Sequence, residues 1–358
     1  MITDWDNTYS RLPNQMYAQQ MPTPVTSPSG LALNKKLADE LGISFGSDWF
    51  EYMSGNKLPD GANPISQAYA GHQFGHWNPQ LGDGRAILLG EVAGDFGHVD
   101  LQLKGAGRTP WSRSGDGRAW FGPILREYLV SEAMHSLGIP TTRALAAAAT
   151  GEKIFREQGP LPGAVICRAA TSHIRIGTFQ YFASRNDLQA LQSLFEYARE
   201  RHFPGSVTIE DVLQKAVQKQ ASLVASWMAV GFIHGVMNTD NSHVAGITID
   251  YGPCAFMDQF VPTKVFSSID RQGRYAYNNQ AKMAAWNLAQ LATALLPLAA
   301  EREAAIENYT EIIQGFSYTF KKAYDKAYSQ KIGYSAGKES SKMIQSLLKM
   351  MEGRHAGN

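Results

Sequence analysis

Residues 234–241 read His-Gly-Val-Met-Asn-Thr-Asp-Asn, and residues 247–253 read Ile-Thr-Ile-Asp-Tyr-Gly-Pro. Asp240, Asn241 and Asp250 bring three oxygen-bearing side chains into this short segment. Hard cations such as Mg²⁺ prefer oxygen ligands. The pattern predicts a polar loop, a strand at 247–249 and a tight acidic turn, an arrangement suited to holding metal-bound phosphates.

The bulk composition excludes several classes of protein. Apolar residues make up 44% of the 358 residues, which is too many for a disordered chain, and the net charge of +1 does not favour a nucleic-acid partner. The two cysteines, Cys167 and Cys254, form neither a disulfide framework nor a zinc site and suit a reducing compartment. With no signal-peptide pattern and no long apolar run, we expect a cytoplasmic protein that does not cross a membrane.

The order of sequence patterns predicts an α+β protein. Residues 1–80 read as an N-terminal wrapping segment, 81–180 as a β-rich nucleotide-binding lobe, and 181–358 as a helical lobe that carries the polar loop. A small β-rich N-terminal lobe and a larger, mainly helical C-terminal lobe are typical of a two-lobed protein kinase-like fold. Helices are expected at 34–41, 124–137, 187–202, 208–232 and 281–296.

A glycine-rich turn precedes two strand-like runs. Residues 81–85 read Leu-Gly-Asp-Gly-Arg, and an apolar run follows at 86–92. Glycines let backbone N–H groups approach a phosphate closely and Arg85 adds charge, although a plain hairpin turn explains the motif equally well. An Asp-Phe-Gly motif at 95–97 precedes the lysine and the loop that a kinase motif of this kind must follow, so we interpret it as a hairpin turn.

A lysine ends the second of these runs. Residues 98–104 alternate and finish at Lys104, and the helix expected at 124–137 carries Glu127 and Glu132. Kinases place a phosphate-gripping lysine on the N-terminal sheet and hold it with a helix glutamate. Either glutamate can be the partner on this pattern, and exposed, solvated charges are the alternative for all three residues.

The spacing of two arginines is compatible with binding one phosphate, and the spacing of two histidines is compatible with binding one metal ion. Arg168 and Arg175 lie seven residues apart, a step that requires an irregular segment if both are to hold one phosphate, and structural salt bridges are the alternative. His72 and His76 lie four apart, as metal ligands on a helix do. Gly75 weakens any helix there, and no third ligand is near, so a metal site is disfavoured.

The segment at 234–241 can be laid over the His-Gly-Asp-x-x-x-x-Asn loop of atypical kinases. Asn241 then takes the place of the metal-binding asparagine, and Asp250 that of the metal-binding aspartate. Val236 occupies the position of the usual catalytic base and cannot accept a proton. Asp240 is the nearest acidic alternative. The chemistry is therefore expected to differ from ordinary phosphorylation, or to be absent.

Motifs over most of the chain are similar to those of the selenoprotein O family of atypical kinase-like proteins. They are YAGHQFG at 69–75, LGDGR at 81–85, LKGAGRTP at 103–110, GDGR at 115–118, SEAMH at 131–135, GIPTTR at 138–143 and SHIR at 172–175. The resemblance implies a kinase-like fold that binds ATP in a flipped orientation. It also implies transfer of AMP to the hydroxyls of Ser, Thr or Tyr in target proteins, with Mg²⁺ or Mn²⁺.

The family's functional residues carry over by motif. Lys104 resembles the phosphate-gripping lysine and Glu127 its helix partner. Asp240 resembles the proposed base, and Asn241 and Asp250 the metal ligands. The remaining residues that the resemblance assigns to nucleotide contacts are Gly82, Gly84, Arg85, Asp116, Gly117, Arg168 and Arg175, and Asp250 also contacts the nucleotide through its metal.

The chain departs from the family pattern in three places. Residues 121–123 replace a Leu-Arg-Ser-like stretch, and Gln180 stands where a glutamate is expected. Family members commonly continue for roughly a hundred further residues and carry a C-terminal redox cysteine pair or selenocysteine. This chain ends at Asn358 with neither, so we expect a truncated form without redox control through that tail.

The sequence therefore predicts a protein adenylyltransferase that acts as a monomer on ATP and on protein substrates, without nucleic acid or membrane. Two alternatives remain open. Val236 and the short C-terminus favour a non-catalytic, ATP-binding scaffold. An ordinary phosphotransferase would instead bind its substrate hydroxyl at Asp240 and release ADP.

Overall fold

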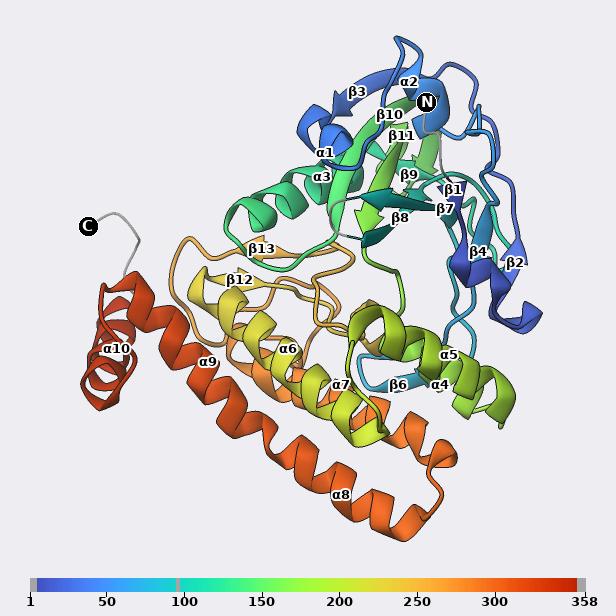
Figure 1. Cartoon of the computed structure of the whole chain (residues 1–358). Helices are drawn as coiled ribbons and strands as arrows, with labels where there is room; N and C mark the ends of the chain where they lie inside the picture. The colour runs from blue at the N-terminus through green and yellow to red at the C-terminus, as the bar shows by residue number, and fades with distance from the viewer. Residues whose placement is uncertain (1–4, 95–96, 353–358) are drawn as a thin grey trace. The chain divides into compact units, whose positions relative to one another are not determined.

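The computed structural model describes residues 5–94 and 97–352, and its contacts divide these residues into two compact units. Unit 1 contains residues 5–71, 78–174 and 189–195, and unit 2 contains residues 72–77, 175–188 and 196–352. Each unit is thus assembled from separate stretches of the chain. Figure 1 shows the strands of unit 1 in blue to green and most helices of unit 2 in yellow to red.

Unit 1 is built on an antiparallel sheet. Within the described residues the sheet has nine strands, in the order β2-β4-β7-β8-β11-β10-β3, with β1 paired to β7 and β9 paired to β11. The strands are β1 (Trp5–Asp6), β2 (Tyr17–Gln19), β3 (Ser29–Leu33), β4 (Ile65–Gln67), β7 (Ala86–Gly94), β8 (Gly97–Lys104), β9 (Ala119–Trp120), β10 (Arg143–Arg156) and β11 (Gly159–Ala170).

The expected strands at 86–92 and 98–104 form the centre of this sheet. β7 and β8 pair as a hairpin from Ala86↔Lys104 to Gly94↔Gly97, which confirms the hairpin predicted at the Asp-Phe-Gly motif. Asp95 and Phe96 of that motif lie outside the described residues. Lys104 also faces Ile166 of β11 across the ladder, so its backbone is held by strands on both sides.

Among the described residues, three α-helices lie wholly within unit 1. They are α1 (Lys35–Glu40), α2 (Trp49–Met53) and α3 (Phe121–Ser136). Asn34 caps α1 by accepting from the Leu37 N–H at 3.0 Å, a favoured use of asparagine at a helix start. α3 begins three residues before its expected start and packs on β10 and β11 through a buried cluster that includes Ile124 and Ile166. This packing fixes the face of α3 that carries Glu127.

Unit 2 is mainly helical. Its longer helices are α4 (Ile176–Ala183), α5 (Leu188–His202, whose residues 189–195 count with unit 1), α6 (Ile209–Ala229), α7 (Gln280–Leu295), α8 (Arg302–Gln314), α9 (Phe316–Lys331) and α10 (Lys338–Met351). α6 packs against α7, α8 and α9. Thr208 and Asp211 form a reciprocal capping box at the start of α6, and α7 ends just before Pro297, as the sequence predicts.

The segment around the Asp-Tyr-Gly turn differs from expectation, because no named strand covers residues 247–249. Two short strands flank the motif instead, β12 (Phe232–Ile233) and β13 (Ala255–Phe256), which pair with each other. Side chains hold the intervening residues: Trp227 donates to Thr248 Oγ1 at 2.9 Å, and the Ile249 carbonyl accepts from His234 Nε2 at 3.0 Å. The prediction of a strand there was wrong, since only Thr248 of these residues forms an isolated bridge.

A small hairpin carries the two histidines with four-residue spacing. It is formed by β5 (Gly71–Gln73) and β6 (His76–Asn78), and its residues 72–77 count with unit 2. Phe74 and Gly75 make the turn with φ of 51° and 87°. Positive φ at both central residues is what a tight hairpin turn requires, and it is uncommon for a bulky residue such as Phe74.

The α+β class is confirmed by the large antiparallel sheet and the helices. Among the residues that the structure describes, none of the helices combines the length and the apolar character needed to span a membrane. The boundaries expected at residues 80 and 180 stay predictions.

Candidate functional site

A buried ion-pair cluster lies at the centre of unit 1. Lys104 Nζ lies 2.6 Å from Glu127 Oε2, and Glu127 Oε1 lies 3.3 Å from Arg168 Nη1. All three side chains are at most one-tenth exposed. Buried charges are tolerated only when they are paired, so the cluster holds each charge in one place. Glu132, the other glutamate of α3, contacts Arg143 instead, at 2.8 Å.

The cluster is joined to the glycine-rich turn by an amide. Gln102 accepts a short hydrogen bond from Arg168 through its oxygen and donates through its nitrogen to Asp83 Oδ2 at 3.0 Å. Asp83 is buried between Gly82 and Gly84. Because a guanidinium only donates and a carboxylate only accepts, the orientation of the Gln102 amide is fixed at both ends.

Close packing leaves no room for a Cβ at two of the predicted glycines, Gly82 and Gly117. A Cβ on Gly82 would lie 2.3 Å from the Trp111 ring, and one on Gly117 would lie 2.1 Å from the Gly107 backbone. Asp116, next to Gly117, lies 2.7 Å from Arg156, which lowers the pKa of this carboxyl against the opposing effect of burial. Arg85 is exposed. These residues keep their two turns compact, and their nucleotide roles stay predictions.

The polar loop at 234–241 is anchored inside unit 2. The His234 side chain is buried, its Nε2 donates to the Ile249 carbonyl at 3.0 Å, and its Nδ1 accepts from the Val236 N–H at 3.4 Å. Burial lowers the pKa of His234, so the ring is neutral and keeps this donor–acceptor pattern. The Asn287 amide on α7 donates to the Met237 carbonyl at 3.0 Å. The loop is therefore held by residues that follow it in the sequence, Ile249 and Asn287.

Asp240 is a buried carboxyl group on this loop. It lies in a short 3-10 turn, Thr239–Asn241, and is 7% exposed. Its Oδ2 accepts from Gln73 Nε2 at 3.0 Å, whereas its Oδ1 has no hydrogen-bond partner within the described residues. Burial raises the pKa of Asp240 to about 6, against the lowering effects of the Gln73 hydrogen bond and of Arg175. A carboxyl group with such a pKa can exchange a proton near neutral pH.

The two predicted metal ligands flank the same segment. Asn241 uses its amide nitrogen to donate to the Val236 carbonyl at 3.2 Å, which leaves the amide oxygen for coordination. Asp250 has φ of 62°, a left-handed conformation found at strained functional turns, and its Oδ2 lies 3.4 Å from Arg175 Nη2. Within the described residues, groups of three or more His, Cys, Asp or Glu side chains suited to a metal are absent.

This donor set fits a magnesium ion that is bound together with a nucleotide. Mg²⁺ commonly keeps waters and takes one or two protein carboxylates plus phosphate oxygens, so a cluster of three acidic side chains is not required. Asn241 and Asp250 would supply one neutral and one anionic oxygen. Asp240 Oδ1, which has no hydrogen-bond partner among the residues that the structure describes, supplies a further acceptor beside them in sequence.

The predicted site residues fall into two groups. Gly82, Gly84, Arg85, Lys104, Asp116, Gly117, Glu127 and Arg168 belong to unit 1, and Arg175, Asp240, Asn241 and Asp250 belong to unit 2. The structure brings together Lys104, Glu127 and Arg168 in the first group. In the second it brings Arg175 to Asp250. Arg168 lies on β11 and Arg175 caps α4, so the seven-residue step does contain the irregular segment that the sequence requires.

Sequence reasoning missed the residues that hold Asp240. Gln73 bonds to Asp240, and Asn238 and Thr239 bond to the neighbouring hairpin residues. Gln180, noted only as a departure from the family, accepts from Thr239 Oγ1 at 2.6 Å. The signal was present in the Gly-His-Gln-Phe-Gly motif, whose polar residues between glycines have no role in a plain turn.

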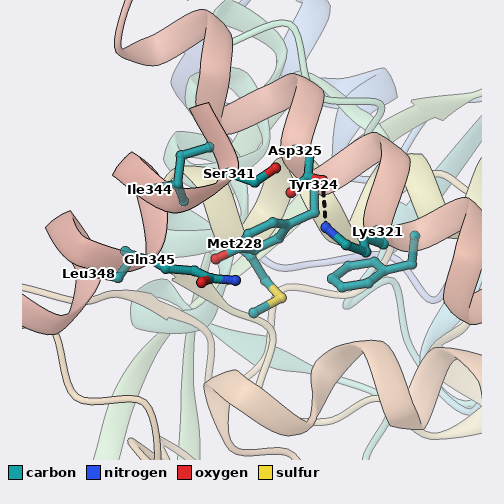
Figure 2. A pocket seen from close by; sticks show the side chains of 9 residues that line it. Met228, Lys321, Tyr324, Asp325, Ser341, Ile344, Gln345 and Leu348 are labelled. Atoms are coloured by element: carbon teal, nitrogen blue, oxygen red, sulfur yellow. Dashed lines mark hydrogen bonds and ion pairs between the residues drawn. The ribbon is translucent and has the colours of Figure 1, made fainter. Parts of the chain in front are cut away.

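A pocket elsewhere in unit 2 contains none of these residues. It has a volume of about 270 Å³ and is lined by the end of α6, by α9 and by α10 (Figure 2). Met228, Tyr324, Ile344 and Leu348 form apolar parts of its wall. Lys321 and Asp325 of α9 form an ion pair of 2.7 Å at this wall. Its lining therefore shares no residue with the polar loop.

Comparison with known proteins identifies relatives over nearly the whole chain. The family model described as "Protein adenylyltransferase SelO" matches residues 1–357. A protein of Jannaschia sp. named "Protein nucleotidyltransferase YdiU" is 55% identical over 97% of this chain and 73% of its own length. Proteins of the same name from Ruegeria sp. (strain TM1040) and Bradyrhizobium diazoefficiens are 58% and 53% identical, over 92% and 97% of this chain and 70% and 73% of their own lengths.

The buried pair of a strand lysine and a helix glutamate in unit 1 is of the kind that kinase-like proteins use. The match over nearly the whole sequence makes the class specific. The chain belongs to the family of SelO protein adenylyltransferases.

Proposed function

We propose that this protein transfers AMP from ATP, bound in a flipped orientation, to Ser, Thr or Tyr hydroxyls of protein substrates. Membership of the SelO family and the relatives named nucleotidyltransferases support the transfer of a nucleotide. Val236 at the position of the usual kinase base and the buried Asp240 four residues later support a reaction other than ordinary phosphorylation.

The reaction forms one bond and breaks one bond at the α-phosphorus of ATP. The substrate hydroxyl oxygen attacks that phosphorus while its bond to the bridging oxygen of the leaving pyrophosphate breaks. Asp240 accepts the hydroxyl proton, and pyrophosphate departs with the bonding electrons. Asn241 and Asp250 would hold a Mg²⁺ or Mn²⁺ ion, which would supply positive charge that offsets the charge of the phosphates.

The residues of unit 1 have binding roles in this proposal. Lys104 carries a charge that Glu127 holds in a fixed direction, so it is oriented before nucleotide arrives. Arg168 shares the same glutamate and can contribute a second cation. Arg175 of unit 2 contacts Asp250. In this proposal Arg175 binds a phosphate and Asp250 binds the metal, so the contact links the two roles.

The state of Asp240 is the observation that carries the proposal. One carboxylate oxygen is occupied by Gln73, and the other is buried and unpartnered within the described residues. An unsatisfied buried carboxylate oxygen is costly, and such groups persist where they serve a function. A proton-accepting role gives this oxygen the substrate hydroxyl as its partner.

The test compares ATP labelled on the α-phosphate with ATP labelled on the γ-phosphate. We expect protein-bound label only from the α-position, with release of pyrophosphate, and loss of transfer in Asp240→Asn. Asp258→Asn is the matched control, because Asp258 is an exposed aspartate of the same unit. Label from the γ-position alone would overturn adenylylation in favour of phosphotransfer. Nucleotide binding without transfer of either label would identify a non-catalytic scaffold.

We further propose that the protein works as a monomer in the cytoplasm, with ATP as its nucleotide. Its two cysteines are buried and neither takes part in a disulfide among the described residues, which suits a reducing compartment. The molecular mass of the purified protein, measured by sedimentation, tests whether it is a monomer. A dimer at micromolar concentration would contradict this proposal.

A further inference from the structure

The hairpin β5–β6 binds the polar loop residue by residue. The His72 N–H donates to Thr239 Oγ1 at 2.7 Å, and the Phe74 N–H donates to Asn238 Oδ1 at 3.0 Å. Between them, Gln73 Nε2 donates to Asp240 Oδ2 at 3.0 Å. Three consecutive hairpin residues thus engage three consecutive loop residues, and all of them belong to unit 2.

Further bonds make this attachment rigid. Thr239 Oγ1 donates to Gln180 Oε1 at 2.6 Å, and Gln180 Nε2 lies 3.0 Å from His72 Nδ1, which closes a ring of hydrogen bonds. Tyr275 donates to the same Asn238 oxygen at 2.7 Å, and its ring lies 5.1 Å from that of Phe74. The bonds at either side of Gln73 start from backbone N–H groups, so they do not need its side chain.

We propose that Gln73 is a positioning residue for Asp240. The proposal rests on the function proposed above and identifies how the candidate base is aimed. A carboxylate can rotate about its last bond, which exchanges its two oxygens. The Gln73 amide donates to Oδ2 and so fixes the carboxylate plane, leaving Oδ1 to receive the proton.

The strained hairpin supports a positioning role. Phe74 holds φ of 51°, and such conformations persist where surrounding contacts impose them, often at functional sites. The contacts that impose it here are the Asn238 bond and the Tyr275 ring. The resulting turn places Gln73 on β5 directly against Asp240, whereas a relaxed loop would leave its side chain free to turn away.

The substitution Gln73→Met tests this role, because it keeps the length of the side chain and removes the donor. We expect kcat for transfer of α-labelled AMP to casein or to the protein itself to fall about 10- to 100-fold, the loss typical of a misaligned catalytic group. The KM for ATP should stay within about twofold, because only the aim of the base changes. Gln218→Met, at an exposed glutamine of α6, is the matched control.

A double substitution separates positioning from a general structural effect. In the Asp240→Asn background, Gln73→Met should cause no further loss, since residues that act through one group are not additive. Multiplicative losses, or a wild-type kcat in Gln73→Met, would overturn the proposal.

A measurement that does not use activity keeps the two proposals distinct. Hydrogen exchange of peptides that cover residues 236–243 should be faster in Gln73→Met than in wild type and in Gln218→Met, while the thermal midpoint stays close to wild type. If wild type transfers no AMP, the proposed function fails, and exchange alone decides the positioning role. Unchanged exchange then rejects it.

Discussion

Lys104 donates to Glu127 over 2.6 Å, and the same glutamate binds Arg168 through its other oxygen at 3.3 Å. One carboxylate therefore serves two buried cations. In a kinase-type pair of one lysine and one glutamate, removing the lysine leaves the buried glutamate charge without a partner. Here Glu127 keeps a partner, so catalytic and structural effects of Lys104 can be measured separately.

Lys104→Met should abolish AMP transfer without unfolding the protein. Loss of an isolated buried pair costs about 3–5 kcal/mol, and we expect a smaller loss of unfolding free energy because Arg168 remains beside Glu127. Urea unfolding and α-label transfer measure the two effects. Lys153→Met, at an exposed lysine of β10, is the control and should retain activity. A folded Lys104→Met protein with normal transfer contradicts the role of Lys104.

Asp250→Asn should raise the concentration of Mg²⁺ needed for half-maximal transfer by about 10- to 100-fold. The substitution removes the anionic ligand, and asparagine tolerates the left-handed φ of 62°, so the turn is kept. Transfer rates over a magnesium titration give the readout, with Asp258→Asn as the control. An unchanged magnesium dependence would remove Asp250 from the metal site.

Gly117→Ala should destabilise unit 1 far more than Gly138→Ala. Both glycines have similar φ, 69° and 73°, but a Cβ at Gly117 would meet the Gly107 backbone at 2.1 Å, and one at Gly138 meets nothing within 4 Å. We expect losses of unfolding free energy of roughly 3 kcal/mol or more for Gly117→Ala and about 1 kcal/mol for Gly138→Ala. Equal losses in urea unfolding would show that the two backbones do not pack closely.

His202 should make stability fall in mild acid. Burial, together with His243, Arg201 and Lys219, lowers the pKa of His202 well below its usual value of 6.5. The unfolded state therefore binds a proton that the folded state does not, so unfolding free energy is lost as pH falls below about 6.5, by up to about 1.4 kcal/mol per pH unit. His202→Gln should reduce this slope in urea unfolding between pH 7 and pH 5. An identical slope would assign the effect to other groups.

Local patterns predicted much of the fold. The α7 helix and the β7–β8 hairpin follow directly from periodicity and turn residues, and Thr208 marks the start of α6. The strand expected at 247–249 is not among the described strands; there the Ile249 carbonyl accepts from the His234 ring, and the Thr248 hydroxyl accepts from Trp227. Periodicity reports the preference of a segment and carries no information about partners of that kind.

The sequence predicted which residues belong to the candidate site, but it did not predict which of their side chains contact one another. The residue pattern left Glu127 and Glu132 equivalent and only the family resemblance favoured Glu127, whereas the packing of α3 on the sheet turns Glu127 toward Lys104. Gln73 was not foreseen at all, because the hairpin and Asp240 are separated by 167 residues. Such a contact depends on the assembled unit, which no local pattern encodes.

The hairpin at 72–77 has a consequence for how the chain can be made and cut. The hairpin is synthesised long before the loop at 238–240. Its hydrogen-bonding groups therefore have no partners in that loop until the loop has been translated. Because the stretches before and after it count with unit 1, no single cleavage of the chain releases unit 2 with its hairpin attached. A fragment that starts at Arg175 would contain Asp240 without Gln73, and a gene split there could regain the complete loop only by reassembly of both pieces.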